Sequence, residues 1–288
     1  MSDNHHSQPQ PKIKEVGFVV NENKAGAVQL ASEMHGALER QGVSVRECHD
    51  SEIDHCFGRG DRLDLIFSFG GDGTILRTAR VAAPLGIPIV GINLGKVGFL
   101  TELVAEQAVA SLPRFVAGDY WIEQRLMLQG ELIRGGKTIN TFHAFNDIVA
   151  NRGSLSRVVE CILSVDGAVL TTYVADGIIF ATPTGSTAYC LAAGGPIVTP
   201  DSRAITVIPI APYLALVRSL VLPEQAILEL QITKATDALI TVDGQQDIQM
   251  QIGDTMRVQA SPITALMARI QPRNYFAATL VDRLRLRG

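Results

Sequence analysis

The sequence predicts an α/β domain followed by an all-β domain, because its hydrophobic periodicity changes once along the chain. From Lys14 to about Leu103, short apolar runs alternate with segments of helical spacing. Between about Trp121 and Pro262 the helical spacing disappears, and turn-forming residues separate short alternating runs. The chain has 288 residues, of which 47% are hydrophobic and 19% are charged, which is enough for packed cores in two domains.

In the first half, apolar runs that are typical of buried strands alternate with helical segments. The strands are expected over 16–20, 43–45, 63–69 and 87–92. One helix is expected to present an apolar face made of Leu30, Ala31, Met34, Ala37 and Leu38. A second helix is expected from about Thr74 to Ala83. Strands that alternate with helices imply a mostly parallel sheet covered on both faces, so we expect a Rossmann-like α/β domain over 13–110.

Glycine-containing turn signals divide the second half into hairpins. They are Gly135-Gly136, Asp166-Gly167 and Asp243-Gly244, each between short alternating runs. This pattern favours an antiparallel β-sandwich or a barrel-like domain, here expected over 111–263. Helical spacing returns near the end, so a helix within about 264–288 is expected to pack back on the first domain, and residues 1–12 are expected to form a disordered tail.

Charge, length of apolar runs and cysteine spacing argue against several classes of protein. The net charge is −4, whereas nucleic-acid binders usually carry a basic excess. The polar start of the chain lacks the apolar core of a signal peptide, and the apolar-looking stretch 204–217 is too short to span a bilayer. The four cysteines show no C-x-x-C spacing, so neither a zinc site nor a disulfide framework is indicated. We therefore expect a soluble, reduced, cytoplasmic protein without nucleic-acid or membrane partners.

The most informative motif is Gly70-Gly71-Asp72-Gly73-Thr74, which lies between a predicted buried strand and a predicted helix. In a parallel sheet this is the edge where ligands bind. The glycines allow backbone N–H groups to approach an anion, and the helix adds the positive end of its dipole. An aspartate repels phosphate, so Asp72 makes more sense as a base or a magnesium ligand. The alternative is a tight turn in which Asp72 caps the helix.

Two familiar nucleotide motifs are absent from the sequence. No G-x-G-x-x-G follows the first predicted strand, so the dinucleotide fingerprint of dehydrogenases is missing. The segment from Gly91 to Lys96 resembles a Walker A loop, but its spacing is one residue short. Val97 also stands where a serine or threonine should bind magnesium.

Two further segments are candidates for ligand binding. Asp176-Gly177 is followed by the hydroxyl-rich run from Thr182 to Tyr189, which could line a nucleotide pocket or form a surface turn with capping hydroxyls. Asn146-Asp147 follows an apolar-aromatic run. An asparagine–carboxylate pair can recognise adenine amino groups or ribose hydroxyls, although such a pair alone is usually a turn.

Taken together and in this order, the motifs resemble those of the bacterial NAD kinases, also called ATP-NAD or polyphosphate-NAD kinases. The resemblance covers most of the chain, from about Val16 to Ala277. The motifs that carry it are Gly70–Thr74, Gly91–Leu100, Asn146-Asp147, Ala175-Asp176-Gly177, Thr182–Tyr189 and Gly194-Gly195-Pro196. The first motif also occurs in lipid kinases and phosphofructokinases, whereas the hydroxyl-rich run is specific.

The resemblance implies roles for individual residues. Asp72 would take the proton from the 2′-hydroxyl of the adenosine ribose of NAD, with Gly73 beside the ligand, and Arg77 would face the nucleotide phosphates. The phosphate loop would consist of Gly70, Gly71, Gly73 and Thr74. Asn146 would bind the adenine end with Asp147 as its partner.

Further contacts to NAD are implied on the second half of the chain. Arg157 and Asp176 match NAD contacts, and Asp176 would reach toward the ligand of a neighbouring subunit. The adenine and ribose pocket would be lined by Thr187, Ala188, Tyr189, Cys190, Leu191 and Ala192. Peripheral contacts are implied at Ala211 and Gln245.

The resemblance also implies an enzyme that uses NAD, a donor that is ATP or polyphosphate, and Mg²⁺ or another divalent metal. A cytoplasmic homodimer or homotetramer is the usual assembly of such enzymes. One departure is Asp147, where the family usually has glutamate. The alternatives are a related lipid or sugar kinase, which the hydroxyl-rich run and Asn146-Asp147 disfavour, and a non-catalytic dinucleotide sensor, which has no use for Asp72.

Overall fold

The computed structural model describes residues 10–95, 98–153, 158–213, 218–235 and 237–285. The chain divides into two compact units, of which unit 1 comprises residues 1–124 and 265–288 and unit 2 comprises residues 125–264. Two strands, β6 (Trp121–Arg134) and β17 (Thr255–Arg269), have residues in both units. The domain limits expected from the sequence, 13–110 and 111–263, stay a prediction.

Unit 1 is an α/β structure built on a parallel sheet. Its own strands are β1 (Glu15–Val20), β2 (Ser44–His49), β3 (Leu65–Phe69), β4 (Ile89–Asn93) and β5 (Leu103–Val104). Its helices are α1 (Ala27–Glu39), α2 (Ile53–Cys56), α3 (Asp72–Leu85), α4 (Ala105–Val116) and α6 (Tyr275–Arg285). The end of β17 pairs with β4, and the order continues through β3 and β1 to β2, all parallel. The predicted α/β class is confirmed.

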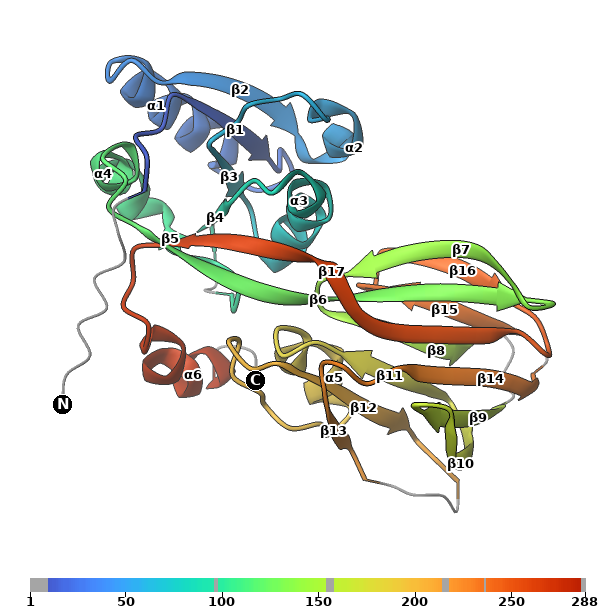
Figure 1. The fold of residues 1–288 in the computed structure, drawn as a ribbon. Helices are drawn as coiled ribbons and strands as arrows, with labels where there is room; N and C mark the ends of the chain where they lie inside the picture. Colours follow the sequence, from blue (N-terminus) through green and yellow to red (C-terminus); the bar gives the residue numbers. More distant parts are fainter. Residues whose placement is uncertain (1–9, 96–97, 154–157, 214–217, 236, 286–288) are drawn as a thin grey trace. The chain divides into compact units, whose positions relative to one another are not determined.

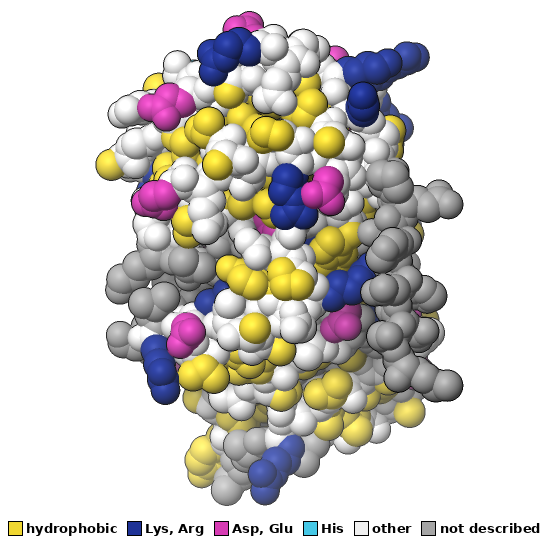
Figure 2. All heavy atoms as spheres, turned by 90° about the vertical axis from the view of Figure 1, so that its left-hand side faces the viewer, with side chains coloured by type: hydrophobic (Ala, Val, Ile, Leu, Met, Phe, Trp, Pro, Cys, Tyr) yellow, Lys and Arg dark blue, Asp and Glu magenta, His cyan; other side chains and the backbone are white. Residues whose placement is uncertain are grey.

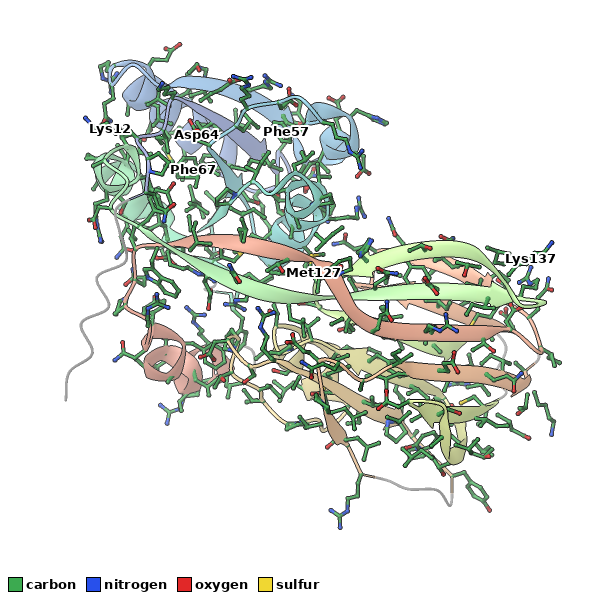
Figure 3. The ribbon with its side chains drawn as sticks, viewed as in Figure 1. Lys12, Phe57, Asp64, Phe67, Met127 and Lys137 are labelled. Atoms are coloured by element: carbon green, nitrogen blue, oxygen red, sulfur yellow. A yellow bond between two sulfur atoms is a disulfide. The ribbon has the colours of Figure 1, made fainter. Side chains whose placement is uncertain are left out.

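Aromatic side chains make the centre of the unit 1 core. Phe67 on β3 lies edge-on to Phe18 on β1 and to Phe115 on α4, with ring centroids 5.8 and 5.5 Å apart. Leu30 and Met34 of α1 join the same buried cluster. Figure 1 shows α1 and α4 on one side of these strands and α3 on the other, and Figure 3 labels Phe67. The apolar face predicted for the first helix is therefore the face that covers the sheet.

Several local features of unit 1 differ from the expectation. Helix α4 was not foreseen, and α3 begins at Asp72 instead of Thr74. Gln10 donates its backbone N–H to the Gly118 carbonyl at 3.1 Å, while residues 1–9 of the expected tail lie outside the described part of the chain. These differences do not change the order of the strands.

A disulfide joins Cys48, at the end of β2, to Cys56, at the end of α2, so the expectation of no disulfide is wrong for this pair. Their Cα atoms lie 5.9 Å apart. The short helix α2 turns the chain back on itself after β2, and this local reversal brings together two cysteines whose spacing matches no common disulfide or zinc motif. Cys161 and Cys190 are buried free thiols.

Unit 2 contains two antiparallel sheets that enclose one hydrophobic core. The first sheet has the order β10-β9-β14-β17-β6-β7, and the second has the order β13-β12-β11-β8-β15-β16. Beyond the two strands already described, the strands are β7 (Lys137–Ala144), β8 (Asp147–Arg152), β9 (Val159–Val165), β10 (Ala168–Ala175), β11 (Gly177–Ala181), β12 (Ala204–Ile210), β13 (Leu220–Pro223), β14 (Leu228–Lys234), β15 (Ala238–Val242) and β16 (Gln246–Met250). Buried residues of both sheets form one cluster, which confirms the predicted β-sandwich.

The three predicted hairpin turns join β6 to β7, β9 to β10 and β15 to β16. Both central residues of each turn have positive φ: 57° and 77° at Gly135-Gly136, 50° and 80° at Asp166-Gly167, and 51° and 65° at Asp243-Gly244. Positive φ at both positions is the signature of the type I′ turn, which matches the twist of paired strands. Lys137 marks the end of the first hairpin in Figure 3.

Strand β11 is buried on both faces, because one face packs in the core between the sheets and a short helix covers the other. Ile178 and Phe180 belong to the core between the sheets, whereas Ile179 and Ala181 belong to a second cluster that includes Cys190. Cys190 lies in α5 (Tyr189–Ala192), which follows a 3₁₀ turn over Gly185–Thr187. The sequence did not predict these two short elements, yet they carry the hydroxyl-rich motif.

Candidate functional site

The first part of the candidate site is the turn between β3 and α3 in unit 1. Gly71 is the N-cap of α3 and Asp72 is its first residue, so the alternative in which Asp72 caps the helix is wrong. A Cβ atom on Gly70 would lie 2.3 Å from the Thr74 hydroxyl oxygen. That hydroxyl also accepts a hydrogen bond from the side-chain amide of Asn21 at 3.0 Å. The glycine at position 70 is therefore required by close packing.

The Asp72 carboxylate is held by the loop that follows β4. Its Oδ2 accepts the backbone N–H of Phe99 and its Oδ1 accepts that of Leu100, both at 3.1 Å. A Cβ atom on Gly98 would lie 2.0 Å from Oδ1 of Asp72. The structure thus brings together two motifs of the sequence, Gly70–Thr74 and Gly91–Leu100. Lys96 and Val97 of the second motif lie outside the described residues.

Arg77, one helical turn after Asp72, forms a bidentate ion pair with Asp50. Its Nε donates to Oδ1 of Asp50 at 2.7 Å, and a terminal nitrogen donates to Oδ2. The Asp50 carboxylate raises the pKa of the Arg77 guanidinium above its ordinary value. Asp50 is buried, with 8% of its surface exposed, so the orientation of Arg77 is fixed by an acidic residue that the sequence did not single out.

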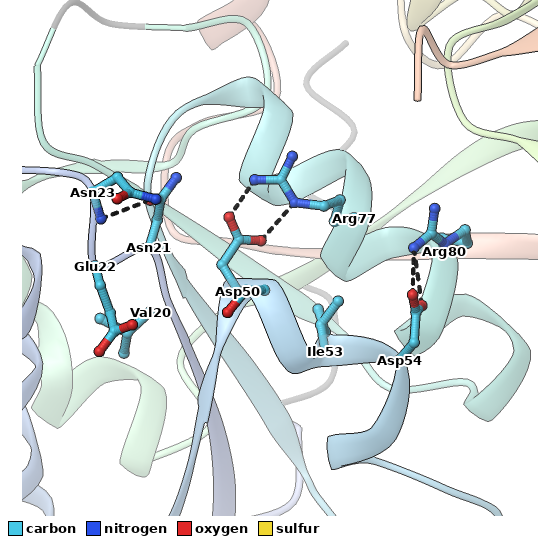
Figure 4. A pocket seen from close by; sticks show the side chains of 10 residues that line it. Val20, Asn21, Glu22, Asn23, Asp50, Ile53, Asp54, Arg77 and Arg80 are labelled. Carbon is cyan, nitrogen blue, oxygen red and sulfur yellow. Dashed lines mark hydrogen bonds and ion pairs between the residues drawn. The ribbon is translucent and has the colours of Figure 1, made fainter. Parts of the chain in front are cut away.

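A pocket of about 330 Å³ surrounds this ion pair on unit 1. Figure 4 shows Arg77 and Arg80 facing Asp50 and Asp54, with the turn after β1 on the opposite side. The lining residues are Val20, Asn21, Glu22, Asn23, Asp50, Ser51, Ile53, Asp54, Arg77 and Arg80. Two guanidinium groups and three carboxylates make this pocket strongly polar.

On unit 2, the hydroxyl-rich segment packs against the backbone of Asn146. The Thr182 N–H donates to the Asn146 carbonyl at 2.9 Å, and the Thr182 hydroxyl donates to the Phe145 carbonyl at 2.7 Å. A Cβ atom on Gly185 would lie 2.0 Å from the Asn146 carbonyl oxygen. Two motifs that are distant in sequence are therefore in direct contact.

The hydroxyl groups of this segment mainly stabilise its own turn. The Ser186 hydroxyl donates to the Pro183 carbonyl at 2.6 Å, and the Thr187 hydroxyl donates to the Thr184 carbonyl at 3.1 Å. Ser186 and Thr187 are buried, so the alternative of a surface turn is wrong. Burial also raises the pKa of the Cys190 thiol to about 11, which keeps it protonated at neutral pH.

A second pocket, of about 350 Å³, lies entirely within unit 2. It is lined by Asn146, Asp147, Val149, Asn151, Ala188, Tyr189, Thr241, Asp243 and Gly244. Tyr189 is 47% exposed, which leaves its ring available for stacking on a ligand. Of the predicted pocket residues, Ala188 and Tyr189 line it, whereas Thr187, Cys190, Leu191 and Ala192 do not.

The carboxyl group of Asp147 is buried at this pocket, with 4% of the residue exposed. Burial and, second, the charge of Asp243 raise the pKa of Asp147 from 3.8 to about 7. At neutral pH a large fraction of Asp147 is therefore protonated and can donate a hydrogen bond as well as accept one.

The remaining predicted contacts lie elsewhere on unit 2. Asp176 precedes β11 and forms an ion pair with Arg152, whose Nε lies 3.1 Å from Oδ1. The Asp176 backbone N–H donates to the Ile210 carbonyl. The next residue, Ala211, has a positive φ of 45°. Gln245 follows the β15–β16 turn and is exposed. Arg157 lies outside the described residues.

Sequence reasoning missed three residues that organise these sites. Asp50 and Asn21 have no motif of their own and act only through Arg77 and Thr74. Asp243 stood in a recognised Asp-Gly turn signal, which explained the residue as a turn former and hid its contacts to Asn146 and Asp147.

The described residues contain neither a cluster of metal-binding side chains nor a helix that could span a membrane. Among them, no group of three or more His, Cys, Asp or Glu side chains is placed to hold a metal ion. Within the same residues, no helix combines the length and the apolar character needed to cross a membrane. On the face shown in Figure 2, the described Lys and Arg side chains are interspersed with Asp and Glu.

Comparison with known proteins decides the family. Residues 51–120 match the ATP-NAD kinase N-terminal domain, and residues 145–270 match the ATP-NAD kinase C-terminal domain. An NAD kinase of Heliobacterium modesticaldum is 41% identical over 269 residues, covering 91% of this chain and 95% of the relative. The chain belongs to the NAD kinase family. A second member, the NAD kinase of Dehalococcoides mccartyi, is 38% identical and covers 94% of this chain and 96% of its own length.

Solved structures of NAD kinases share this fold. The crystal structure of yeast NADH kinase complexed with NADH has a TM-score of 0.79 and 26% identity, covering 94% of this chain and 87% of the yeast chain. An NAD kinase from Archaeoglobus fulgidus in complex with ATP has a TM-score of 0.75 and 26% identity, covering 95% and 100%. The family resemblance inferred from the motifs is confirmed.

Proposed function

We propose that this chain, as a member of the NAD kinase family, transfers the γ-phosphoryl group of ATP to the 2′-hydroxyl of the adenosine ribose of NAD, giving NADP and ADP. The observation that carries this proposal is the Asp72 carboxylate, which the amides of Phe99 and Leu100 hold at the start of α3. Family membership supplies the substrates, and this carboxylate supplies a group that can act on a hydroxyl.

In the proposed reaction, the 2′-oxygen attacks the γ-phosphorus while its proton passes to Asp72. The bond between the γ-phosphorus and the bridging oxygen breaks, and ADP leaves. Phosphoryl transfer has a loose transition state, so catalysis depends mainly on positioning and on neutralising charge. A general base contributes on the order of 10²–10⁴-fold. Its two amide donors restrain Asp72 in one orientation before substrate arrives.

The predicted ligand contacts divide between the two described pockets. We assign the adenosine part of NAD to the unit 2 pocket, where Tyr189 offers a ring face and Asn146 and Asp147 offer polar groups. We assign nucleotide phosphates to the Arg77 side of the unit 1 pocket, because a guanidinium group attracts them. Polyphosphate in place of ATP presents the same phosphate chemistry, so the donor is distinguished by the assay below.

The metal and the assembly are further parts of the proposal. Magnesium usually binds through substrate phosphates and one or two carboxylates and does not need a cage of protein ligands. Among the described residues no such cage occurs, and we propose that Mg²⁺ binds together with the donor phosphates. A cytoplasmic homodimer or homotetramer, with Asp176 near a subunit interface, remains the proposed assembly.

The test is NADP formation by the purified protein given NAD, Mg²⁺ and either ATP or polyphosphate, followed with an NADP-specific dehydrogenase. We expect Asp72→Asn to lose about 10²–10⁴-fold in kcat while NAD still binds. Asp119→Asn, at an exposed carboxylate of unit 1 whose side chain is 65% exposed, is the matched control and should keep full activity. Near-full turnover by Asp72→Asn would overturn the assignment of the base.

A further inference from the structure

Asp243, at the tip of the β15–β16 hairpin, is bonded to three consecutive residues of another segment. Its Oδ1 accepts the backbone N–H groups of Asn146 at 2.7 Å and of Asp147 at 3.1 Å. Its Oδ2 accepts that of Phe145 at 2.9 Å. In return, the Asp243 N–H donates to the Asp147 carbonyl at 3.0 Å. One side chain thus fixes the backbone just before and at the start of β8.

The same segment is held from its other side by the hydroxyl-rich motif. Thr182 binds the carbonyl groups of Phe145 and Asn146, and Gly185 packs on the Asn146 carbonyl. Donors and acceptors of this backbone are therefore occupied by two different elements. With the main chain fixed, the side chains of Asn146 and Asp147 are directed to the unit 2 pocket, which they line together with Asp243.

A second Asp-Gly turn in the same unit shows that this arrangement is not a general property of such turns. Asp166, with φ 50° against 51° for Asp243, also begins a type I′ hairpin. Its carboxylate accepts the backbone N–H of Ile227 at 2.8 Å, and its own N–H donates to the Ile227 carbonyl at 2.9 Å. Asp166 therefore bonds one residue, Ile227, which precedes β14 and does not line the pocket, whereas Asp243 bonds three residues that include two pocket residues.

We propose that Asp243 is a positioning residue for NAD binding: it holds the main chain of Phe145, Asn146 and Asp147 so that the last two present their side chains to the ligand. This inference rests on the proposed NAD-binding role of the unit 2 pocket. A carboxylate that accepts several amide hydrogen bonds is a strong and directional anchor, because charge-assisted bonds are about twice as strong as neutral ones. The charge of Asp243 also contributes to the raised pKa of Asp147.

The test compares Asp243→Asn with Asp166→Asn in the full-length protein. An asparagine side chain has one acceptor oxygen and one amide group that donates. It therefore cannot accept the Phe145 N–H with one terminal atom and the N–H groups of Asn146 and Asp147 with the other. For Asp243→Asn we expect Kd and KM for NAD to rise at least tenfold, while KM for ATP changes little. Asp166→Asn should leave Kd and KM for NAD within twofold.

Three outcomes would overturn the inference. They are an unchanged Kd for NAD in Asp243→Asn, an equal loss of NAD and ATP affinity, and the same loss in Asp166→Asn, which would indicate a turn-forming role only. Absence of NADP formation by the wild-type protein would contradict the proposed function, whereas the NAD-binding comparison would still decide the role of Asp243.

Hydrogen exchange on the wild-type protein tests the inference even if Asp243→Asn does not fold. We expect the amides of Phe145 and Asn146 to exchange more slowly than the Ile227 amide, which Asp166 holds, and to slow further when NAD is added. Rates equal to or faster than that of Ile227, unchanged by NAD, would overturn the positioning role.

Discussion

Asp72 and Gly98 are in such close contact that a single methyl group would not fit between them. A Cβ atom at position 98 would lie 2.0 Å from Oδ1 of Asp72. The glycine therefore allows the loop after β4 to bring the Phe99 and Leu100 amides to the carboxylate. The orientation of the proposed base is thus determined by a residue with no side chain.

Gly98→Ala is expected to lower kcat by at least tenfold, because the added methyl group must displace either the Asp72 carboxylate or the loop. Gly95→Ala is the control in the same loop, since a Cβ atom there meets nothing within 4 Å. Steady-state kinetics of NADP formation measure both variants. Equal kcat values for the two would contradict the role of Gly98.

Asp50→Asn is expected to destabilise the protein by about 2 kcal/mol, because it removes the charge that holds Arg77 in a buried, hydrogen-bonded pair. Asp54→Asn breaks the corresponding pair with Arg80, in which the Asp54 side chain is 59% exposed. Exposed pairs contribute only about 0.2–1 kcal/mol. Urea denaturation of both variants measures the difference, and equal losses would show that burial of Asp50 is unimportant.

Asp147 is expected to make stability depend on pH. Its pKa is about 7 in the folded protein and 3.8 is its ordinary value, so the folded state binds the proton more tightly and the free energy of unfolding falls as pH rises from about 4 to 7. Asp147→Asn resembles the protonated form and should be more stable than the wild type above pH 7, by at most about 4 kcal/mol. Urea denaturation across pH 4–8 tests this, and parallel pH curves for the two proteins would contradict it.

Reduction of the Cys48–Cys56 disulfide is expected to lower the free energy of unfolding by about 2 kcal/mol, because the bond closes a loop of 8 residues in the unfolded chain. Urea denaturation with and without a dithiol reductant measures this change. Cys48→Ser/Cys56→Ser should show the lower stability in both conditions. Four reactive thiols in the denatured, unreduced protein would show that the bond does not form in solution.

Sequence periodicity was sufficient for the class of both units because burial imposes it directly. Alternating residues such as Ile178 and Ile179 are directed to opposite faces of β11, and two-residue turns such as Gly135-Gly136 require positive φ. The short helices α2 and α5 were missed because four residues carry too little periodicity to be distinguished from a turn.

The candidate site was predicted only where residues have a motif. Asp72 and Asn146 were found because neighbouring residues mark them, whereas Asp50 and Asn21 act through tertiary contacts with Arg77 and Thr74. Asp243 shows a different limit of sequence analysis. The Asp-Gly turn signal explained this residue correctly as a turn former, so its hydrogen bonds to the backbone of Asn146 and Asp147 were not foreseen. Composition likewise does not show which hydroxyl groups of the segment Thr182–Thr187 form hydrogen bonds within their own turn, because this depends on how the segment folds.

Unit 1 is assembled from the two ends of the chain, which has a consequence for its biosynthesis. Glu102 is buried, and its carboxylate accepts the Arg269 side chain and the backbone N–H groups of Ile270 and Gln271. These donors follow the whole of unit 2 in the sequence. The buried contacts of Glu102 therefore form only after the sequence of unit 2 has been translated, so the N-terminal α/β segment cannot complete its own packing while it is the only part of the chain that has been synthesised.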